Sequence, residues 1–398
     1  MATFIFGDES GTAVDPALDL ARYIHAMNGT DAPSQIQESE AFDLALQNID
    51  KLLTPASEKE KDREAVDSVI SVVCSVFQRI FLKPGANVSQ LVEKFVNKIT
   101  SNSSAQPSLR LKAMSTIYNV VNGNGEARFS IFLSMVNFAS AAGKDLLSMV
   151  LSHCSNLESM FTEWAVDIEK QRLMFSAIFE ALKKHDNRDG AHEYRLKFLR
   201  SFQGGKDFSS ALAHAQTAVV EAIANPKIYL FDYYMDLDAV KALKADPSRT
   251  KVFDLLHIFA YDDLDVYNKF YKENSAFIDG LGLSMEESLR KIRLLSLCSL
   301  ASSKATLKYS EIASSMQILE SEVESWVIKA ITAKLMDAKM DQITKTVAVN
   351  HCADRVFTTK QWVSLREKLS TWRDSMRNLL ASIETARQTQ LQELQASC

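Results

Sequence analysis

Apolar residues recur every three or four positions along most of the chain, which is the spacing of one face of an α-helix. The segment after residue 63 shows this clearly, with apolar side chains at Val66, Val69, Ile70, Val73, Phe77 and Ile80. Asp15 and Pro16 predict a helix start, because an aspartate side chain accepts free amides of the first turn and proline needs no partner there. The pattern therefore predicts a chain built mostly of helices.

Short clusters of Gly, Pro, Asn, Asp and Ser separate these helical segments at close intervals. Examples lie at residues 100–108, 186–190 and 246–249. Each half-apolar helix between two clusters depends on packing and must stack on its neighbours. We therefore predict a right-handed α-solenoid of the tetratricopeptide or HEAT kind. A compact globular bundle is the alternative, because the sequence has no strict period.

The pattern changes after Ser303. Apolar spacing predicts a short helix at Tyr309–Met316 and a second helix that begins near Val323. Ser321 and Glu324 fit a capping box at the start of the second helix. Two helices joined by a tight turn predict a helix-turn-helix.

A period of two follows, which places alternate side chains on opposite faces of a strand. It predicts strands near residues 339–341, 346–350 and 355–358. Together with the two helices, this β-ribbon predicts a winged helix. We expect Val347 and Val349 to face Val356 and Phe357, and one strand edge to remain open to a partner.

The last segment repeats apolar residues at the alternating spacing of a coiled-coil seam. Seven residues form this seam: Trp362, Leu365, Leu369, Trp372, Met376, Leu379 and Ile383. Two tryptophans favour a buried partner surface, because tryptophan is enriched at interface hot spots. We expect Trp362 and Leu365 to pack on this chain, and the residues from Trp372 onward to pack on helices of other proteins. An amphipathic helix packed wholly on its own domain is the alternative.

Composition narrows the range of functions. The 398 residues include only 12 Gly and 7 Pro, which suits a helical chain. A formal net charge of −5 gives no global basic field for nucleic acid or anionic lipid. The 5 cysteines form no CxxC pair, which predicts free thiols in a reducing compartment. We expect a cytoplasmic protein, because the sequence has neither a signal-peptide pattern nor a long apolar run.

No catalytic motif is complete. The glycines on either side of Asn124 lack a third glycine, and Gly204 begins only a superficial likeness to a phosphate loop. His153 and His351 each precede a cysteine, but structural zinc sites use wider spacings. Acidic residues open the second winged-helix helix, where they would repel phosphates. The sequence therefore predicts no catalysis, no cofactor, no metal and no sequence-specific nucleic-acid binding.

The elements divide the chain into four predicted regions. These are an N-terminal helical region (1–100), a helical-repeat region (101–302), a winged helix (303–358) and a C-terminal heptad helix with a tail (359–398). This order resembles the PCI-domain proteins. The resemblance is carried by KIRLLSLCSLAS at 291–302, then YSEIASSM, EVESWVIKAITAKLM, and AKMDQ with TVAV.

Further segments are similar to one PCI subunit of eukaryotic translation initiation factor 3. They lie at residues 108–121, 179–191, 225–243, 270–283 and 351–376, so the resemblance covers about residues 100–385. It implies a non-catalytic scaffold whose winged helix docks edge to edge and whose last helix joins a bundle. The implied partners are other PCI and MPN subunits of that factor, with indirect contact to the 40S ribosomal subunit. A PCI scaffold subunit of the deneddylating signalosome or the proteasome lid is the alternative.

Overall fold

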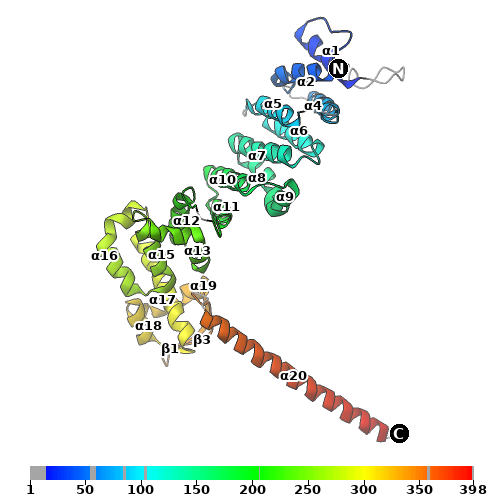
Figure 1. Ribbon diagram of the computed structural model, residues 1–398. Helices are drawn as coiled ribbons and strands as arrows, with labels where there is room; N and C mark the ends of the chain where they lie inside the picture. The colour runs from blue at the N-terminus through cyan, green and yellow to red at the C-terminus, as the bar shows by residue number, and fades with distance from the viewer. Residues whose placement is uncertain are drawn as a thin grey trace. The chain divides into compact units, whose positions relative to one another are not determined.

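The computed structural model describes residues 15–53, 60–83, 87–102, 105–205, 207–355 and 359–396 (Figure 1). Within these ranges the chain is mainly helical, with a small antiparallel sheet and a long C-terminal helix. This confirms the predicted α-rich class with a small β element. The chain divides into two compact units, Met1–Ser201 and Phe202–Cys398.

The first unit is entirely helical in its described part. Its elements are α1 (Pro16–Asn28), α2 (Glu38–Gln47), α3 (Ile49–Leu52), α4 (Glu60–Phe81), α5 (Val88–Thr100), α6 (Pro107–Val120), α7 (Gly125–Ala142), α8 (Lys144–Ser152), η2 (His153–Asn156), α9 (Leu157–Trp164), α10 (Ile168–Lys184) and α11 (Arg188–Arg200). Most of these helices pack on the next helix in the chain, and several also pack on the one after it.

Local sequence signals explain how these helices begin and pack. Asp15 Oδ1 accepts a hydrogen bond from the Ala17 amide at 3.2 Å, so the predicted start of α1 is confirmed. The six apolar residues predicted for one face of α4 are all buried. Burial of such a face removes apolar surface from water, which is the main term that stabilises a stack of half-apolar helices.

One glycine pair that resembles a cofactor motif has a packing role instead. Asn124 Oδ1 accepts a hydrogen bond from the Ala127 amide at 3.1 Å and so caps α7. A Cβ atom on Gly125 would lie 2.3 Å from the Trp164 carbonyl oxygen. Only glycine therefore allows the start of α7 to approach the end of α9 this closely.

The second unit combines helices with the sheet. Its elements are α12 (Leu212–Ala224), α13 (Asp232–Asp236), α14 (Asp238–Lys241), η3 (Ala242–Ala245), α15 (Thr250–Tyr261), α16 (Leu264–Gly280), α17 (Met285–Ser303), β1 (Thr306–Lys308), α18 (Tyr309–Met316), η4 (Glu320–Glu322), α19 (Val323–Thr332), β2 (Met336–Asp341), β3 (Thr346–Cys352) and α20 (Thr359–Ala396).

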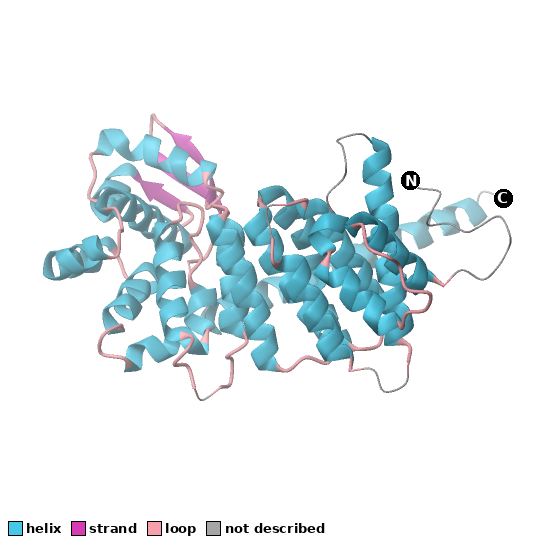
Figure 2. Cartoon of the chain, turned by 90° about the horizontal axis from the view of Figure 1, so that it is seen from above, coloured by secondary structure: helices cyan, strands magenta, loops and turns pink. Residues whose placement is uncertain are grey.

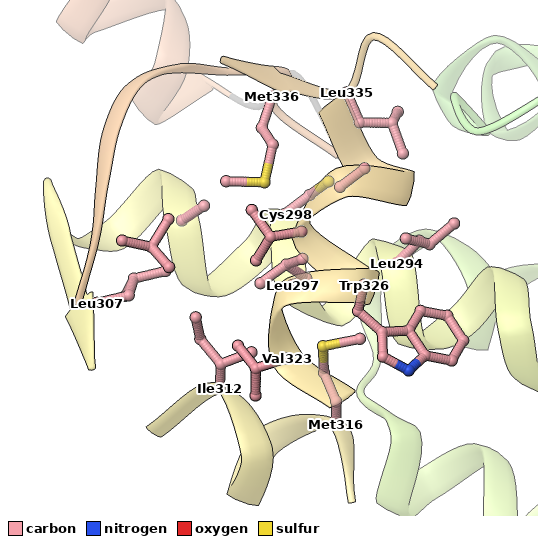
Figure 3. Packing of buried hydrophobic residues seen from close by; sticks show 14 of the residues in the cluster. Leu294, Leu297, Cys298, Leu307, Ile312, Met316, Val323, Trp326, Leu335 and Met336 are labelled. Atoms are coloured by element: carbon pink, nitrogen blue, oxygen red, sulfur yellow. The ribbon is translucent and has the colours of Figure 1, made fainter. Parts of the chain in front are cut away.

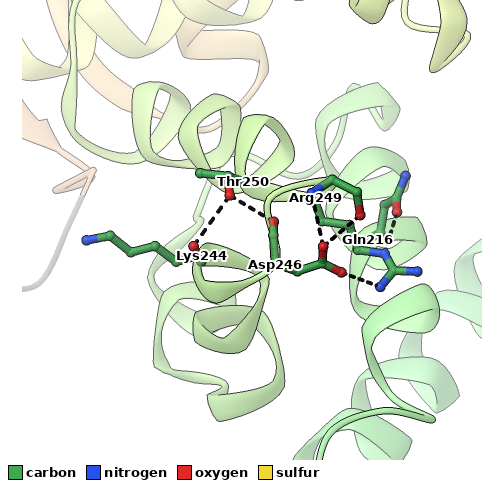
Figure 4. A network of polar contacts seen from close by, with 6 residues as sticks. Gln216, Lys244, Asp246, Arg249 and Thr250 are labelled. Atoms are coloured by element: carbon green, nitrogen blue, oxygen red, sulfur yellow. Dashed lines mark hydrogen bonds and ion pairs between the residues drawn. The ribbon is translucent and has the colours of Figure 1, made fainter.

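A polar network fixes the turn that leads into α15 (Figure 4). Arg249 Nη1 lies 2.7 Å from Asp246 Oδ2, and Arg249 Nε donates to Gln216 Oε1 of α12 at 3.2 Å. Thr250 Oγ1 donates to the Asp246 carbonyl at 2.8 Å. These bonds tie the start of α15 to α12, which belongs to the same unit.

The sheet has three antiparallel strands in the order β1-β3-β2, which lie side by side among helices (Figure 2). Leu307 pairs with Val347 on one side of β3, and Met340 pairs with Val347 on the other. Two of the predicted strands are confirmed as β2 and β3. The sequence interpretation missed β1, and of the predicted strand 355–358 only Arg355 lies within the described residues, where it forms a bend.

A compact apolar core joins the sheet to α17, α18 and α19 (Figure 3). Its larger members are Leu294, Leu297, Leu307, Tyr309, Ile312, Met316, Val323, Trp326, Val327, Leu335, Met336 and Val347. The apolar stripe predicted from Val323 onward supplies much of this core. Because every layer contributes side chains, the helices and the sheet fold as one body.

The predicted capping box at the start of α19 is wrong. α19 begins at Val323 without a side-chain cap. The Glu324 carboxylate instead accepts hydrogen bonds from the Tyr309 hydroxyl at 3.3 Å and from Gln342 Nε2 at 3.0 Å. These two long-range partners, which lie in α18 and in the β2–β3 turn, replace the local bond.

Candidate interaction surface along the C-terminal helix

α20 carries the predicted seam, and all seven of its side chains are exposed. Trp372 is 64% exposed and Ile383 is 60% exposed. Val363 and Leu380 are exposed beside the seam and widen it. A contiguous apolar stripe of this length is a mark of a protein interaction surface, because isolated soluble proteins keep such patches small.

One expectation about the seam is wrong. Trp362 was predicted to pack on this chain, but it is 62% exposed. Leu365, one turn further along, is exposed as well. The reason is that α20 leaves its domain within its first turn, so the seam is uncovered from its first residue onward.

The two flanks of the seam differ in chemistry. On one flank Arg366 and Arg373 each follow a seam residue directly, and Arg387 continues that flank two heptads later. The other flank carries Lys368, Ser375 and Ser382, each of which directly precedes a seam residue. The first flank therefore suits an acidic helix, and the small serines of the second allow close approach.

The exposed charges of α20 remain available to a partner. Arg373 Nε lies 3.1 Å from Asp374 Oδ1, and both side chains are more than half exposed. Such a surface pair contributes little to stability, because water and salt screen it. A partner carboxylate can therefore compete for Arg373 at small cost.

A buried arginine anchors the chain just before α20. Arg355 Nη2 donates hydrogen bonds to the Ile258 and Phe259 carbonyls, both at 2.8 Å, and Nε donates to the Phe259 carbonyl at 3.0 Å. These carbonyls lie near the end of α15, where the helix carries partial negative charge, and the Ile258 carbonyl also accepts the Asp262 amide at 3.1 Å. Burial lowers the pKa of Arg355 to about 10, so the guanidinium stays charged at neutral pH.

Sequence reasoning missed this role of Arg355. The period-two pattern placed the residue in the predicted strand 355–358, whereas its partners are backbone carbonyls nearly a hundred residues earlier in the chain. Every residue has a backbone carbonyl, so the residue types of a single sequence do not indicate which carbonyls a buried arginine will bind. The Ala353 amide, which donates to the Leu335 carbonyl at 2.8 Å, fixes the same segment.

The residues predicted on the β-ribbon have different places. Val347 is fully buried and Val349 is half-buried, while Val356 and Phe357 lie outside the described residues. The prediction that strand 346–350 offers an open edge is wrong, because β3 pairs with a strand on each side. Val347 therefore serves the core and not a partner.

The start of α19 is acidic and partly engaged within the domain. Lys345 Nζ lies 3.7 Å from Glu320 Oε1, and Glu324 holds Tyr309 and Gln342. A DNA-reading helix presents Arg, Lys, Asn or Gln to base edges at this place. Carboxylates there disfavour contact with phosphates.

In the two histidine–cysteine pairs the cysteines lie in packed regions, while His153 and His351 are exposed. Burial raises the pKa of the Cys154 thiol to about 12, and Cys352 Sγ lies 3.5 Å from the Cys298 carbonyl oxygen. Across the described ranges, no three His, Cys, Asp or Glu side chains are grouped to hold a metal ion. None of the helices in this part of the chain combines the length and apolar character that a membrane crossing needs.

Comparisons with known proteins place these features in a family. The PCI domain model matches residues 269–351, and the model described as "eIF3 subunit M, C-terminal helix" matches residues 355–383. A relative from Dictyostelium discoideum, eukaryotic translation initiation factor 3 subunit M, is 30% identical over 335 residues, which cover 84% of this chain and 82% of the relative. The chain belongs to the family of eukaryotic translation initiation factor 3 subunit M.

Similar proteins of the same name occur in animals. The Xenopus tropicalis subunit M is 29% identical over 380 residues, covering 94% of this chain and 98% of the relative. The human subunit M is 27% identical over 371 residues, covering 93% of this chain and 95% of the relative. The predicted PCI resemblance is confirmed, and the subunit M C-terminal-helix model runs from Arg355 to Ile383, the last seam residue.

Proposed function

We propose that this chain is a non-catalytic, cytoplasmic scaffold subunit of translation initiation factor 3, which helps to assemble the initiation complex on the 40S ribosomal subunit. Its direct partners are other PCI and MPN subunits of that factor, and its contact with the ribosome is indirect. The observation that carries this proposal is the uncovered seam of α20, together with membership of the subunit M family.

The proposal assigns a finer architecture to the two units. The helices of residues 101–302 form a right-handed solenoid, residues 303–358 form a winged helix, and residues 359–398 form the docking helix and tail. The packing of most first-unit helices on their sequence neighbours supports the first assignment. The order β1-α18-α19-β2-β3 supports the second.

The seam suits a helical bundle with other subunits. Seven apolar residues of one stripe become buried when α20 packs between partner helices, and each large side chain contributes about 1.5–3 kcal/mol when fully buried. The arginine flank selects an acidic helix and so gives orientation and specificity more than affinity. The hydrogen bonds of Arg355 to the α15 carbonyls fix the chain just before α20. This lowers the entropy cost of binding α20 to a partner.

Affinity purification of the tagged full-length chain, followed by quantitative mass spectrometry, tests this proposal. We expect stoichiometric recovery of translation initiation factor 3 subunits together with 40S proteins at lower yield. Recovery of signalosome or proteasome-lid subunits in their place would overturn it. A Trp372→Ala chain purified in parallel provides the matched background, because it lacks a seam residue that is exposed in the free chain.

A further inference from the structure

The turn between β2 and β3 presents an isoleucine to solvent on a rigid support. Ile343 is 96% exposed. Asp341 Oδ1 accepts hydrogen bonds from the Ile343 and Thr344 amides at 3.0 and 3.3 Å. Thr344 Oγ1 also lies 2.8 Å from Thr346 Oγ1. The turn is therefore held by its own side chains before any partner arrives.

A second set of bonds ties this turn to both helices beneath it. Gln342 Nε2 donates to Glu324 Oε2 of α19 at 3.0 Å. The Tyr309 amide of α18 donates to the Lys345 carbonyl at 3.0 Å. Lys345 Nζ lies 3.7 Å from Glu320 Oε1, next to Leu319, which is 69% exposed. Leu319 thus directly precedes one partner of this ion pair in the chain, and Ile343 lies two residues before the other.

This arrangement is unusual for a hairpin turn. Turns are normally polar, and a single exposed apolar residue on a mobile loop needs no explanation. Here the backbone that carries Ile343 is ordered by four hydrogen bonds or contacts within the domain. Pre-ordering the backbone beneath an exposed apolar side chain lowers the entropy cost of binding a partner.

The charges around the turn identify the kind of partner. The bonded group that holds the turn contains the carboxylates of Asp341, Glu320 and Glu324, and Lys345 is its cation. Such an environment repels phosphates, which excludes RNA as the favoured ligand. It attracts a protein surface that carries Lys or Arg around an apolar hollow.

We propose that the Ile343 turn is an apolar anchor that inserts into a pocket on a neighbouring protein subunit, whose rim carries lysine or arginine. The inference rests on the proposed scaffold function and adds a contact separate from the seam of α20. Leu319 packs at the edge of the same contact. The pocket excludes water around Ile343, as hot-spot residues require.

Site-specific photo-crosslinking in the reconstituted complex tests this anchor. Benzoylphenylalanine replaces Ile343 in one full-length chain and the exposed Leu82 of the first unit in a control chain. We expect position 343 to crosslink to one protein subunit, at an apolar residue with Lys or Arg nearby in sequence or structure. Absence of a protein crosslink, or a crosslink to ribosomal RNA, would overturn the inference.

Affinity measurements separate this inference from the proposed function. Ile343→Asp should weaken binding to the remaining subunits about tenfold or more, while Leu82→Asp leaves it unchanged. The thermal midpoint of the free chain should stay the same, because Ile343 makes no core contact. If Ile343→Asp binds normally while Trp372→Ala does not, the anchor is wrong and the scaffold function stands. If both variants bind normally, the proposed function fails as well.

Discussion

At the scale of single residues, buried cations fasten helix ends in both units. In the first unit, Arg110 Nη1 donates to the Ile99 carbonyl near the end of α5 at 2.7 Å. In the second unit, Lys291 Nζ donates to the Ala222 and Asn225 carbonyls at 2.7 and 2.8 Å, and Arg355 serves α15 in the same way. The last carbonyls of a helix lack helical partners, so a cation there satisfies both their hydrogen bonding and their partial charge.

The buried position of Lys291 predicts a pH dependence of stability. Burial lowers the pKa of its ammonium from 10.5 to about 7, while the three carbonyls oppose that change. Above pH 7 the unfolded chain then binds more protons than the folded chain, so the free energy of unfolding rises with pH. Relative to Lys291→Met, the wild-type chain should gain about 1–2 kcal/mol between about pH 7 and pH 8.5.

Urea unfolding of both chains at the two pH values measures this difference. Both pH values lie below the range in which the buried thiols of Cys74 and Cys154 lose their protons in the folded chain, since burial raises the pKa of each to about 12. Parallel curves for the two chains would mean that the carbonyls keep Lys291 charged throughout, and would contradict the lowered pKa.

At the scale of elements, helices were predictable and strand pairing was not. The apolar residues of one helical face recur three and four positions apart in the sequence. The buried faces of α4 and α19 could therefore be predicted from the sequence. β1 has three residues, and its partner strand begins about forty residues later. Such non-local pairing leaves no local period, so β3 was taken as an edge although it is the central strand.

The central place of β3 predicts the effect of core substitutions in it. Val347 is fully buried between Leu307 and Met340, so Val347→Ala should lower the free energy of unfolding by about 2 kcal/mol. Val349→Ala in the same strand is the matched control and should cost less, because Val349 is only half-buried. Chemical denaturation measures both. Equal effects, or loss of binding without loss of stability in Val347→Ala, would restore an edge role for this strand.

The flanks of α20 predict an asymmetric response to charge reversal. Arg373→Glu should slow association with the other subunits, because it places a carboxylate against the acidic helix that we infer on that flank. Lys368→Glu makes the same change in charge on the opposite flank and should have a smaller effect. Association rates measured from ~0.05 M to ~0.5 M salt should converge for the two variants, since salt screens exposed charges. A larger effect of Lys368→Glu at low salt would reverse the assigned orientation.

At the scale of the whole molecule, the chain exposes an apolar stripe along α20 and an apolar residue at the β2–β3 turn. Each unit has its own buried core, and the second unit carries the PCI match, the Ile343 turn and α20. The family was predictable because the order of several short segments survives in the sequence even where each segment alone is weak. The exposure of Trp362 was not predictable, because the direction in which a helix leaves its domain depends on distant contacts such as those of Arg355.

The central claim is that α20 holds this chain in its assembly through an uncovered seam. The most direct measurement is the dissociation constant of the full-length chain for the assembly of the remaining factor subunits, compared for wild type, Trp372→Ala and Asn378→Ala. Trp372 lies on the seam and Asn378 lies away from it on the same helix, and both are exposed. We predict a loss of about thirtyfold in affinity for Trp372→Ala, no change for Asn378→Ala, and equal thermal midpoints for all three free chains. Wild-type affinity of Trp372→Ala, or a lowered midpoint of its free monomer, would contradict the account.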